Sequence, residues 1–593
     1  MTSLKHKIFP YLAKAKQALG FFLFSKTSGR LSQMDIDKKL VYSLSPRKIP
    51  SGRQLKYLPR FLNTRENRIL KICAVIILAN LIYLGFFLSG KYLKSVPVSG
   101  GLYTEAVIGY PKAINPLYAA SRDVDNDLSR LIYSSLYHYD ATGSLIADLA
   151  TDYILSEDKK EYVITIKSGV KWHNGGELTA DDVVFTFNLI QNENYRSPLR
   201  LELVGVNIEK IDDTTIKFVL PEPYAPFLEM LSFGIMPKVV WENIGPDAAV
   251  LADLNLKPIG SGPYKFQSLS KNKDGDLREY RLEVNKDYYG QVPYIEEINF
   301  KFYTDHAEAI AAFNGGHLDG LSVLPFEYRA DLAVKDSTRI YNLLRPQIFG
   351  IFFNQTNNKA LEDKNIRIAL AKAIDKDSLV SEIFADVYQT ADGPILKTNQ
   401  AYGGNIENYN YNPEEAKIFL ADKNLTIKLA AIDVNNNASV AEKIKTYWEA
   451  VGVTVSLDIF PLEQASNMVR NREFEILLYG QSVGGDPDVF AFWHSSQIGT
   501  KGLNLAAYKN TEVDQLLTEA RSTASGEERI AKYQRFQEIL TADIPTIFLY
   551  SPAYTYVHNR RVKGFEGRAV FEPADRFSLV SSWYIKTKKT LAK

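Results

Sequence analysis

The 593-residue sequence is poor in cysteine and histidine, and these two shortages exclude several kinds of site. The single cysteine, Cys73, excludes an intrachain disulfide framework and any zinc site built from cysteines. The seven histidines form no HExxH motif and no close pair, so we expect neither a metal nor another cofactor. Charged residues make up 23% and hydrophobic residues 46%, as in ordinary globular proteins, and the length predicts two or three domains.

Positive charge is concentrated at the start of the chain. Residues 1–71 contain 16 Lys/Arg and 3 Asp/Glu, a net charge of +13, which leaves −12 for the rest of a chain that carries +1 overall. Such a basic segment is typical either of an amphipathic helix on anionic lipid or of a solvated tail. Nucleic-acid binding is not expected, because no recognisable reading motif accompanies the charge.

An uncharged apolar run of 19 residues, 72–90, follows the basic segment. About 20 apolar residues span a bilayer core, so the run predicts one transmembrane helix. The preceding positive charge places the N-terminus in the cytoplasm and the rest of the chain outside. We expect an uncleaved, single-pass anchor in the cell (inner) membrane, because a secretory signal would start near residue 1; cleavage near Ser89 and Gly90 is the alternative.

Residues 162–190 predict a strand, a turn and a capped helix. Apolar and polar residues alternate over 163–168, which is typical of a half-buried strand. Gly175 and Gly176 then supply turn residues able to take positive φ. Thr179 and Asp182 have the spacing of a capping box and precede apolar residues at helical spacing.

Strand and helix patterns alternate from residue 348 onward, which predicts an α/β lobe. A helix is also expected at 127–137, and a second capping box at Thr511 and Asp514. The expected strands are 349–354, 426–432, 453–459 and 474–479, and the expected helices are 365–374, 440–450 and 529–540.

The sequence of residues 162–190 resembles the signature of the family 5 solute-binding proteins, which are oligopeptide- and dipeptide-receptor components of ABC importers. Further segments resemble the same family in the same order, over about residues 101–585: GSGPY at 260–264, NKDYYG at 285–290, GHLD at 316–319, and then FFNQTNN, DKNIRIALAKAID and YNPEEAKIFL. The resemblance implies an α/β, two-lobed periplasmic-binding-protein-like fold (type II, with an extra subdomain in the N-terminal lobe) after one N-terminal transmembrane helix. It also implies two strand crossings between the lobes, near residues 345–350 and 544–549.

The resemblance implies a division of the whole chain and a set of partners. The partners would be a peptide or small solute ligand, ABC permease and ATPase subunits, and the membrane through residues 72–90. The expected segments are a basic cytoplasmic tail (1–71), the transmembrane helix (72–90), the first segment of lobe I (100–132), the extra subdomain (133–256), lobe I continued (257–345), lobe II (346–547) and the return to lobe I (548–593).

The resemblance places a ligand groove at two loops. Peptide-binding members carry an Asp for the ligand ammonium shortly before an Asp-Pro motif, and aligning on Asp486 puts Val483 or Gly484 there. This departure predicts a blocked, cyclic or non-peptide ligand, or a peptide gripped through its backbone. The alternative is that Asp486 itself reaches the ammonium. The candidate ligand-binding residues are Ala120, Ser121, Arg122, Gly480, Gln481, Ser482, Val483, Gly484 and Asp486.

Two other functions stay open at the level of sequence. Residues 480–484 read GQSVG, the nucleophile-elbow pattern GxSxG, with Ser482 as nucleophile and Asp543 and His558 as partners of a membrane-anchored hydrolase. No HGGG-type oxyanion segment accompanies the pattern, and residues 485–487 delay the helix that an elbow requires. The long basic tail also fits a ligand-sensing receptor without transport. Asp486 and Asp488 could hold a cation, although helix capping beside Pro487 is expected instead.

Overall fold

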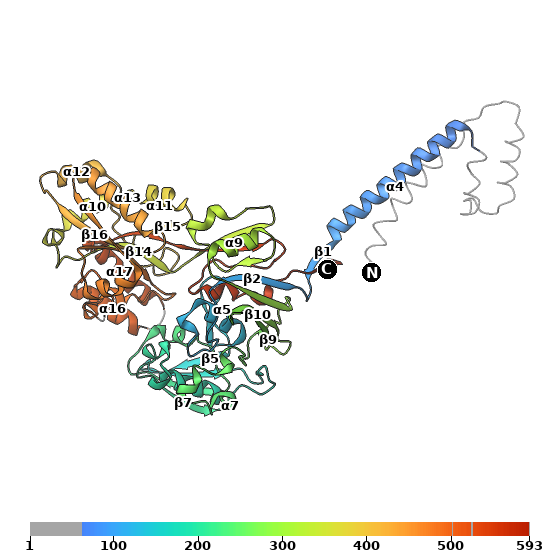
Figure 1. Cartoon of the computed structure of the whole chain (residues 1–593), viewed down its shortest axis with the longest axis horizontal. Helices are drawn as coiled ribbons and strands as arrows, with labels where there is room; N and C mark the ends of the chain where they lie inside the picture. Colours follow the sequence, from blue (N-terminus) through green and yellow to red (C-terminus); the bar gives the residue numbers. More distant parts are fainter. Residues whose placement is uncertain (1–61, 501, 524–525, 592–593) are drawn as a thin grey trace, which may run out of the picture. The chain divides into compact units, whose positions relative to one another are not determined.

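A computed structural model describes residues 62–500, 502–523 and 526–591. Most of the predicted basic tail, residues 1–61, therefore lies outside the described residues. The chain divides into two units, Met1–Ser95 with Lys589–Lys593 and Val96–Lys588. Figure 1 traces the chain in sequence colours.

Within the described residues, the first unit contains one long apolar helix, α4 (Thr64–Tyr92), drawn in blue in Figure 1. It starts before the predicted span because Asn63 caps it: Asn63 Oδ1 accepts from the N–H groups of Arg65 and Glu66 at 3.0 and 3.1 Å. Its apolar side chains are exposed, Val75 by 66% and Ile77 by 60%. The helix is long and apolar enough to cross a membrane, a test that a signal sequence also passes.

The second unit is built on three larger sheets, the first with seven strands. Strand β2 lies inside it, parallel to both β11 and β12, and the other pairs are antiparallel. The order is β13 (Thr338–Leu344), β20 (Ala553–Asn559), β12 (Gly320–Leu321), β2 (Leu102–Ile108), β11 (Glu297–Tyr303), β10 (Leu277–Val284) and β9 (Tyr264–Lys271).

The second sheet has six strands and the predicted alternation of strand and helix. Its order is β15 (Gln389–Thr390), β19 (Thr546–Ser551), β14 (Gln347–Phe353), β18 (Ile476–Ser482), β16 (Thr426–Ile432) and β17 (Thr454–Phe460). Helices α13 (Asn437–Ala450) and α14 (Leu462–Asn471) connect β16, β17 and β18, and β16 is parallel to both of the others. Along β14, Ile351 and Phe353 join one buried cluster and Ile348 and Phe352 join another, so helices and loops cover both faces of this sheet.

The third sheet contains the predicted strand, turn and helix. Strand β6 (Glu161–Ile166) lies in a four-stranded antiparallel sheet of order β5 (Ala150–Leu155), β6, β8 (Thr215–Val219) and β7 (Asn207–Asp212). Helix α6 (Ala180–Gln191) follows, and its capping box is confirmed. The Asp182 carboxylate accepts from the Thr179 N–H at 2.9 Å and from the Lys238 N–H at 2.8 Å, which ties the helix start to a distant loop.

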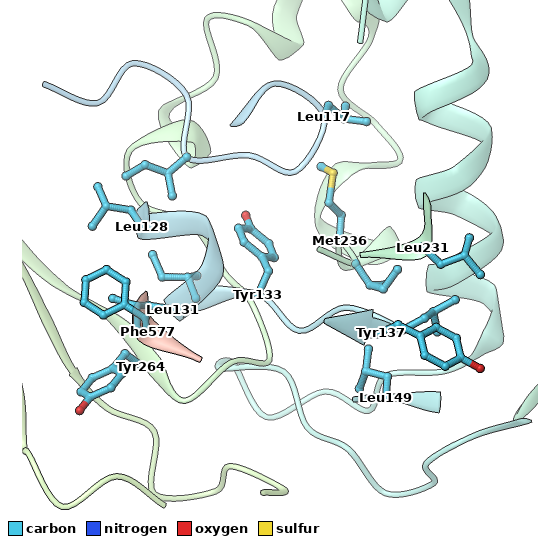
Figure 2. Close-up of a cluster of buried hydrophobic side chains, with 14 of the residues drawn as sticks. Leu117, Leu128, Leu131, Tyr133, Tyr137, Leu149, Leu231, Met236, Tyr264 and Phe577 are labelled. Carbon is cyan, nitrogen blue, oxygen red and sulfur yellow. The ribbon is translucent and has the colours of Figure 1, made fainter. Parts of the chain in front are cut away.

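One hydrophobic core joins the four-stranded and seven-stranded sheets. Figure 2 shows part of it, with Tyr133 between Leu131 and Met236. The drawn residues come from segments far apart in the sequence, so the subdomain packs as a continuation of the seven-stranded side. They include Leu117, Leu128, Tyr137, Leu149, Leu231, Tyr264 and Phe577.

Two strand switches connect the seven-stranded and six-stranded sheets. Strand β13 leads into β14 through residues 345–346, and β19 leads into β20 through Pro552. The Ser551 hydroxyl donates to the Gln347 carbonyl at 2.7 Å, so the two switches lie side by side. The first switch lies within the predicted range of 345–350. The second switch lies after the predicted range of 544–549, because β19 continues to Ser551.

Two helices begin earlier than the sequence predicts. Helix α5 covers Asp123–Ile132 and not 127–137, because it begins directly after the extended Arg122 and ends before the extended Tyr133. Helix α16 (Thr511–Ser522) is capped by Asn510, whose Oδ1 accepts from Glu512 N–H at 3.0 Å. The predicted cap, Thr511, therefore already lies in the first turn, since asparagine is a better cap and stands one residue earlier.

Candidate functional site

The loop of residues 483–489, here called the β18 loop, follows β18 and is held by two arginines. Asp486 accepts from both terminal nitrogens of Arg529 at 2.6 Å each, and Asp488 Oδ2 accepts from Arg521 Nε at 2.9 Å. Arg521 belongs to α16 and Arg529 to α17 (Glu527–Asp543). Each carboxylate is thus neutralised by a bidentate or charge-assisted contact. Asp488 Oδ1 also accepts from the N–H of Phe490, the first residue of α15 (Phe490–Trp493), but the cap position of this helix is Val489, which makes no side-chain cap hydrogen bond.

The β18 loop touches segments beside the four-stranded sheet through a glycine. A Cβ on Gly485 would lie 2.9 Å from the ring of Tyr139 and 3.1 Å from that of Phe571, so any larger residue would have to move two aromatic rings. Tyr139 belongs to β3 (Tyr137–Tyr139), and its ring centroid lies 4.2 Å from that of Phe571. The Arg521 guanidinium lies 5.2 Å from the ring of Tyr224. The loop therefore brings the six-stranded side of the unit against the subdomain.

Glu229 lies at this contact. It belongs to the 3-10 helix η5 (Ala225–Leu231) and lies close to Tyr139 and Asp486. Burial, and next the negative charge of Asp486, raise the pKa of Glu229 to about 7. Unlike Asp486, Glu229 has no ion pair of its own among the described residues. It is therefore the carboxylate of this contact whose charge is not matched.

Two cavities lie in different parts of the second unit. A cavity of about 320 Å³, here called the η5 cavity, is lined by Ala120, Arg130, Glu229 and others from α5, η5 and Glu572. A cavity of about 680 Å³, here called the β18 cavity, is lined by residues 479–482 at the end of β18 and by Arg470 and Arg472. Both volumes lie near the range of small-molecule sites.

The predicted site residues divide between these places. Gly480, Gln481 and Ser482 line the β18 cavity together, whereas Ala120 lines the η5 cavity. Ser121 and Arg122 are exposed at the start of α5 and line neither cavity.

The two positions aligned with the ammonium-binding Asp point elsewhere. Val483 is only 9% exposed and packs in the core of the six-stranded side, with its N–H bonded to the Pro346 carbonyl at 2.9 Å. Gly484 is exposed with φ of +68°, a conformation that favours glycine. Asp486 is paired with Arg529. None of the three presents an unpaired carboxylate to a ligand.

Ser482 lacks the surroundings of a hydrolase nucleophile. It is the last residue of β18, and the next helix starts only at Phe490, so no strand–turn–helix elbow forms. Asp543 accepts from the Tyr508 hydroxyl at 2.7 Å, and His558 Nδ1 bonds the Asn559 carbonyl at 2.9 Å. Among the described residues, these three candidates therefore form no triad.

Sequence patterns missed the residues that make the contact. Glu229 stands in a proline-rich segment that reads only as the end of a strand, and Tyr139 reads as one of many aromatic residues. Their partners are more than 200 residues away, at 485–486, and no local spacing reports such a pairing. A carboxylate beside prolines between two strand patterns was the one available signal, and it is weak.

Two sheets joined by two strand switches, with a cavity of about 680 Å³ at the end of β18, define the class of two-lobed solute-binding proteins. The chain belongs to the bacterial extracellular solute-binding proteins of family 5, since the family's "Middle" profile matches residues 144–502. This is a family of binding proteins that serve ABC importers, not of enzymes.

Individual relatives agree over most of the chain. The chain is 27% identical over 530 residues to the oligopeptide-binding protein AppA of Bacillus subtilis, covering 84% of this chain and 94% of the relative. It is 26% identical over 519 residues to the dipeptide-binding protein of Escherichia coli, covering 81% and 96%. The structure of the ABC transporter substrate-binding protein CtaP of Listeria monocytogenes superposes with a TM-score of 0.72 at 27% identity, covering 82% of this chain and 99% of that one.

Proposed function

We propose that this protein captures peptides or peptide-like solutes outside the cell membrane and delivers them to the permease and ATPase of an ABC importer. The observation that carries the proposal is the membership in family 5 together with relatives named for oligopeptide and dipeptide binding over more than four fifths of the chain. The cavity of about 680 Å³ at the end of β18 supports it, because its volume lies in the range of small-molecule sites.

Capture occurs by closure of two lobes, lobe I with its subdomain at 100–345 and 553–588 and lobe II at 346–551. The strand switches at 345–346 and Pro552 support this division, because only these two connections join the seven-stranded and six-stranded sheets within the described residues. Paired crossings of this kind permit hinge bending while each sheet stays intact. The contact of Gly485 with Tyr139 is the place where closure brings the β18 loop against the subdomain.

Helix α4 tethers the protein to the cell membrane, with the basic segment on the cytoplasmic side. The exposed apolar surface of α4 and the net charge of +13 over residues 1–71 support this orientation. The tether keeps captured solute close to the permease, which raises its effective concentration there.

Uptake by cells tests the transport function. A strain carrying the chain is compared with a strain lacking it for import of an isotope-labelled tripeptide mixture, at matched levels of the permease. We expect uptake to fall on loss of the chain and to return with the full-length protein. Unchanged uptake, with ligand binding retained in the purified protein, would favour a sensing role.

A further inference from the structure

Two short segments, residues 91–99 at the end of α4 and residues 585–593, carry positive charge only. Neither segment contains an Asp or a Glu. Their lysines are Lys91, Lys94, Lys586, Lys588, Lys589 and Lys593. The chain beyond residue 71 is otherwise acidic, with a net charge of −12, so these segments are a local exception to it. The capture of a solute between two lobes makes no use of this charge.

The fold joins the two segments in a two-stranded sheet. Strand β1 (Leu93–Pro97) follows α4 directly and pairs with β21 (Thr587–Leu591). The residues up to Ser95 and residues 589–593 belong to the same unit as α4. We call β1 and β21 together the exit ribbon. Because paired strands lie about 4.8 Å apart, the charges of the two segments act at one place.

The lysines of the exit ribbon have no counter-charge in the folded chain. Lys94, Lys588 and Lys589 are all exposed. Within residues 62–500, 502–523 and 526–591, no carboxylate oxygen lies within 4.0 Å of their Nζ atoms. The ribbon is therefore a compact positive surface that is open to an anionic partner.

The chain length from α4 to Lys94 keeps this surface close to a bilayer that α4 crosses. The apolar run ends at residue 90, and four extended residues reach at most about 14 Å. The headgroups occupy roughly the first 5–8 Å of that distance. Lys94 thus lies at most about 9 Å beyond them, which is close to the Debye length of about 8 Å at physiological salt.

The orientation of α4 does not account for these lysines. The positive-inside rule concerns lysine and arginine on the cytoplasmic side, where residues 1–71 already carry a net charge of +13. Charge on the other side of the helix adds nothing to that preference. The lysines of the exit ribbon therefore call for another partner, and the bilayer surface is the anionic surface that α4 itself brings within reach.

We propose that the exit ribbon binds the anionic phosphodiester headgroups on the outer face of the membrane through Lys94, Lys588 and Lys589. The inference rests on the tether in the proposed function and adds a second membrane contact, at the surface. An ammonium group is a compact charge that suits a phosphate oxygen. The contact restricts the motion of the residues that follow α4 relative to the bilayer.

The test uses the full-length protein in nanodiscs, one kind of phosphatidylcholine alone and one with about a third of phosphatidylglycerol. An amine-acylating reagent is added, and mass spectrometry measures the acylation rate of each lysine. The variant Lys94→Gln/Lys588→Gln removes two lysines of the ribbon and leaves Lys589 as the reporter. The matched control, Lys273→Gln/Lys417→Gln, removes two exposed lysines of the second unit that also have no ion pair among the described residues.

We expect Lys589 of the wild type and of the control variant to react roughly fivefold more slowly in the anionic nanodiscs than in the neutral ones, because one lysine near an anionic surface gains roughly fivefold in affinity. The difference should shrink in Lys94→Gln/Lys588→Gln and disappear in about 1 M salt, where the Debye length is about 3 Å. Lys273 of the wild type should react equally in both kinds of nanodisc.

Two results would overturn the lipid site. Equal acylation of Lys589 in the two kinds of nanodisc would overturn it directly, and protection that then appears when the permease is added would assign the ribbon to an acidic surface of the permease. A difference that is unchanged in Lys94→Gln/Lys588→Gln would show that these two lysines do not form the site. Protein recovered outside both kinds of nanodisc would overturn the tether itself, which separates that failure from a failure of the lipid site.

Discussion

Replacing Glu229 by glutamine should stabilise the protein above neutral pH and leave its stability unchanged in acid. In the folded chain, burial raises the pKa of Glu229 from 4.5 to about 7. The stabilisation that comes from the bound proton is fully present below pH 4.5 and is lost as the pH rises through about 7. A shift of that size corresponds to up to about 3 kcal/mol, which the wild type loses and the variant does not.

Urea unfolding of the full-length proteins in detergent, followed by tryptophan fluorescence at pH 5 and pH 8.5, measures this difference. We expect the two proteins to differ by less than about 1 kcal/mol at pH 5, and Glu229→Gln to exceed the wild type by up to about 3 kcal/mol at pH 8.5. The exposed control, Glu222→Gln, should show no such pH-dependent difference. A constant difference across the two pH values, or a variant less stable at pH 8.5, would refute the reasoning about Glu229.

Three further predictions concern other parts of the chain. Arg529→Met leaves Asp486 buried without its partner and should lower the free energy of unfolding in urea by about 3–5 kcal/mol. The control Arg535→Met, at a side chain that is 52% exposed, should change it by less than about 1 kcal/mol. Similar losses in the two variants would contradict the role of the buried pair. Protease added to intact cells, after any outer membrane or cell wall has been made permeable, should digest residues 96–588 and spare the basic segment. A mature protein that starts near Lys91 would show that α4 is a cleaved signal. A saturating solute should reduce the radius of gyration in small-angle scattering and raise the melting temperature; thermal stabilisation without compaction would indicate a rigid cleft.

The unit at 162–190 could be predicted from sequence because its determinants are local. A strand alternation, a glycine turn and the Thr179–Asp182 box lie within a few turns of one another, and each specifies the same structure. The same local logic placed β16 at its observed residues, 426–432. It failed by one residue at α16, where Asn510, a better cap than threonine, caps the helix in place of Thr511.

The candidate site could be predicted only in part, because its decisive contacts join distant segments. Residues 480–482 follow a recognisable strand and do line a cavity. Val483 could not be placed from its sequence position, since its burial depends on packing against the Pro346 segment. Glu229 and Arg529 could not be found from the sequence, because the pKa and the pairing of a charged side chain depend on its neighbours in the folded chain. Here those neighbours come from the β18 loop.

The most direct test of the account is mass spectrometry of what co-purifies with the full-length protein. The protein is extracted in mild detergent, washed and denatured, and the released small molecules are identified. We expect peptides or peptide-like solutes. A released solute without peptide character would contradict peptide capture.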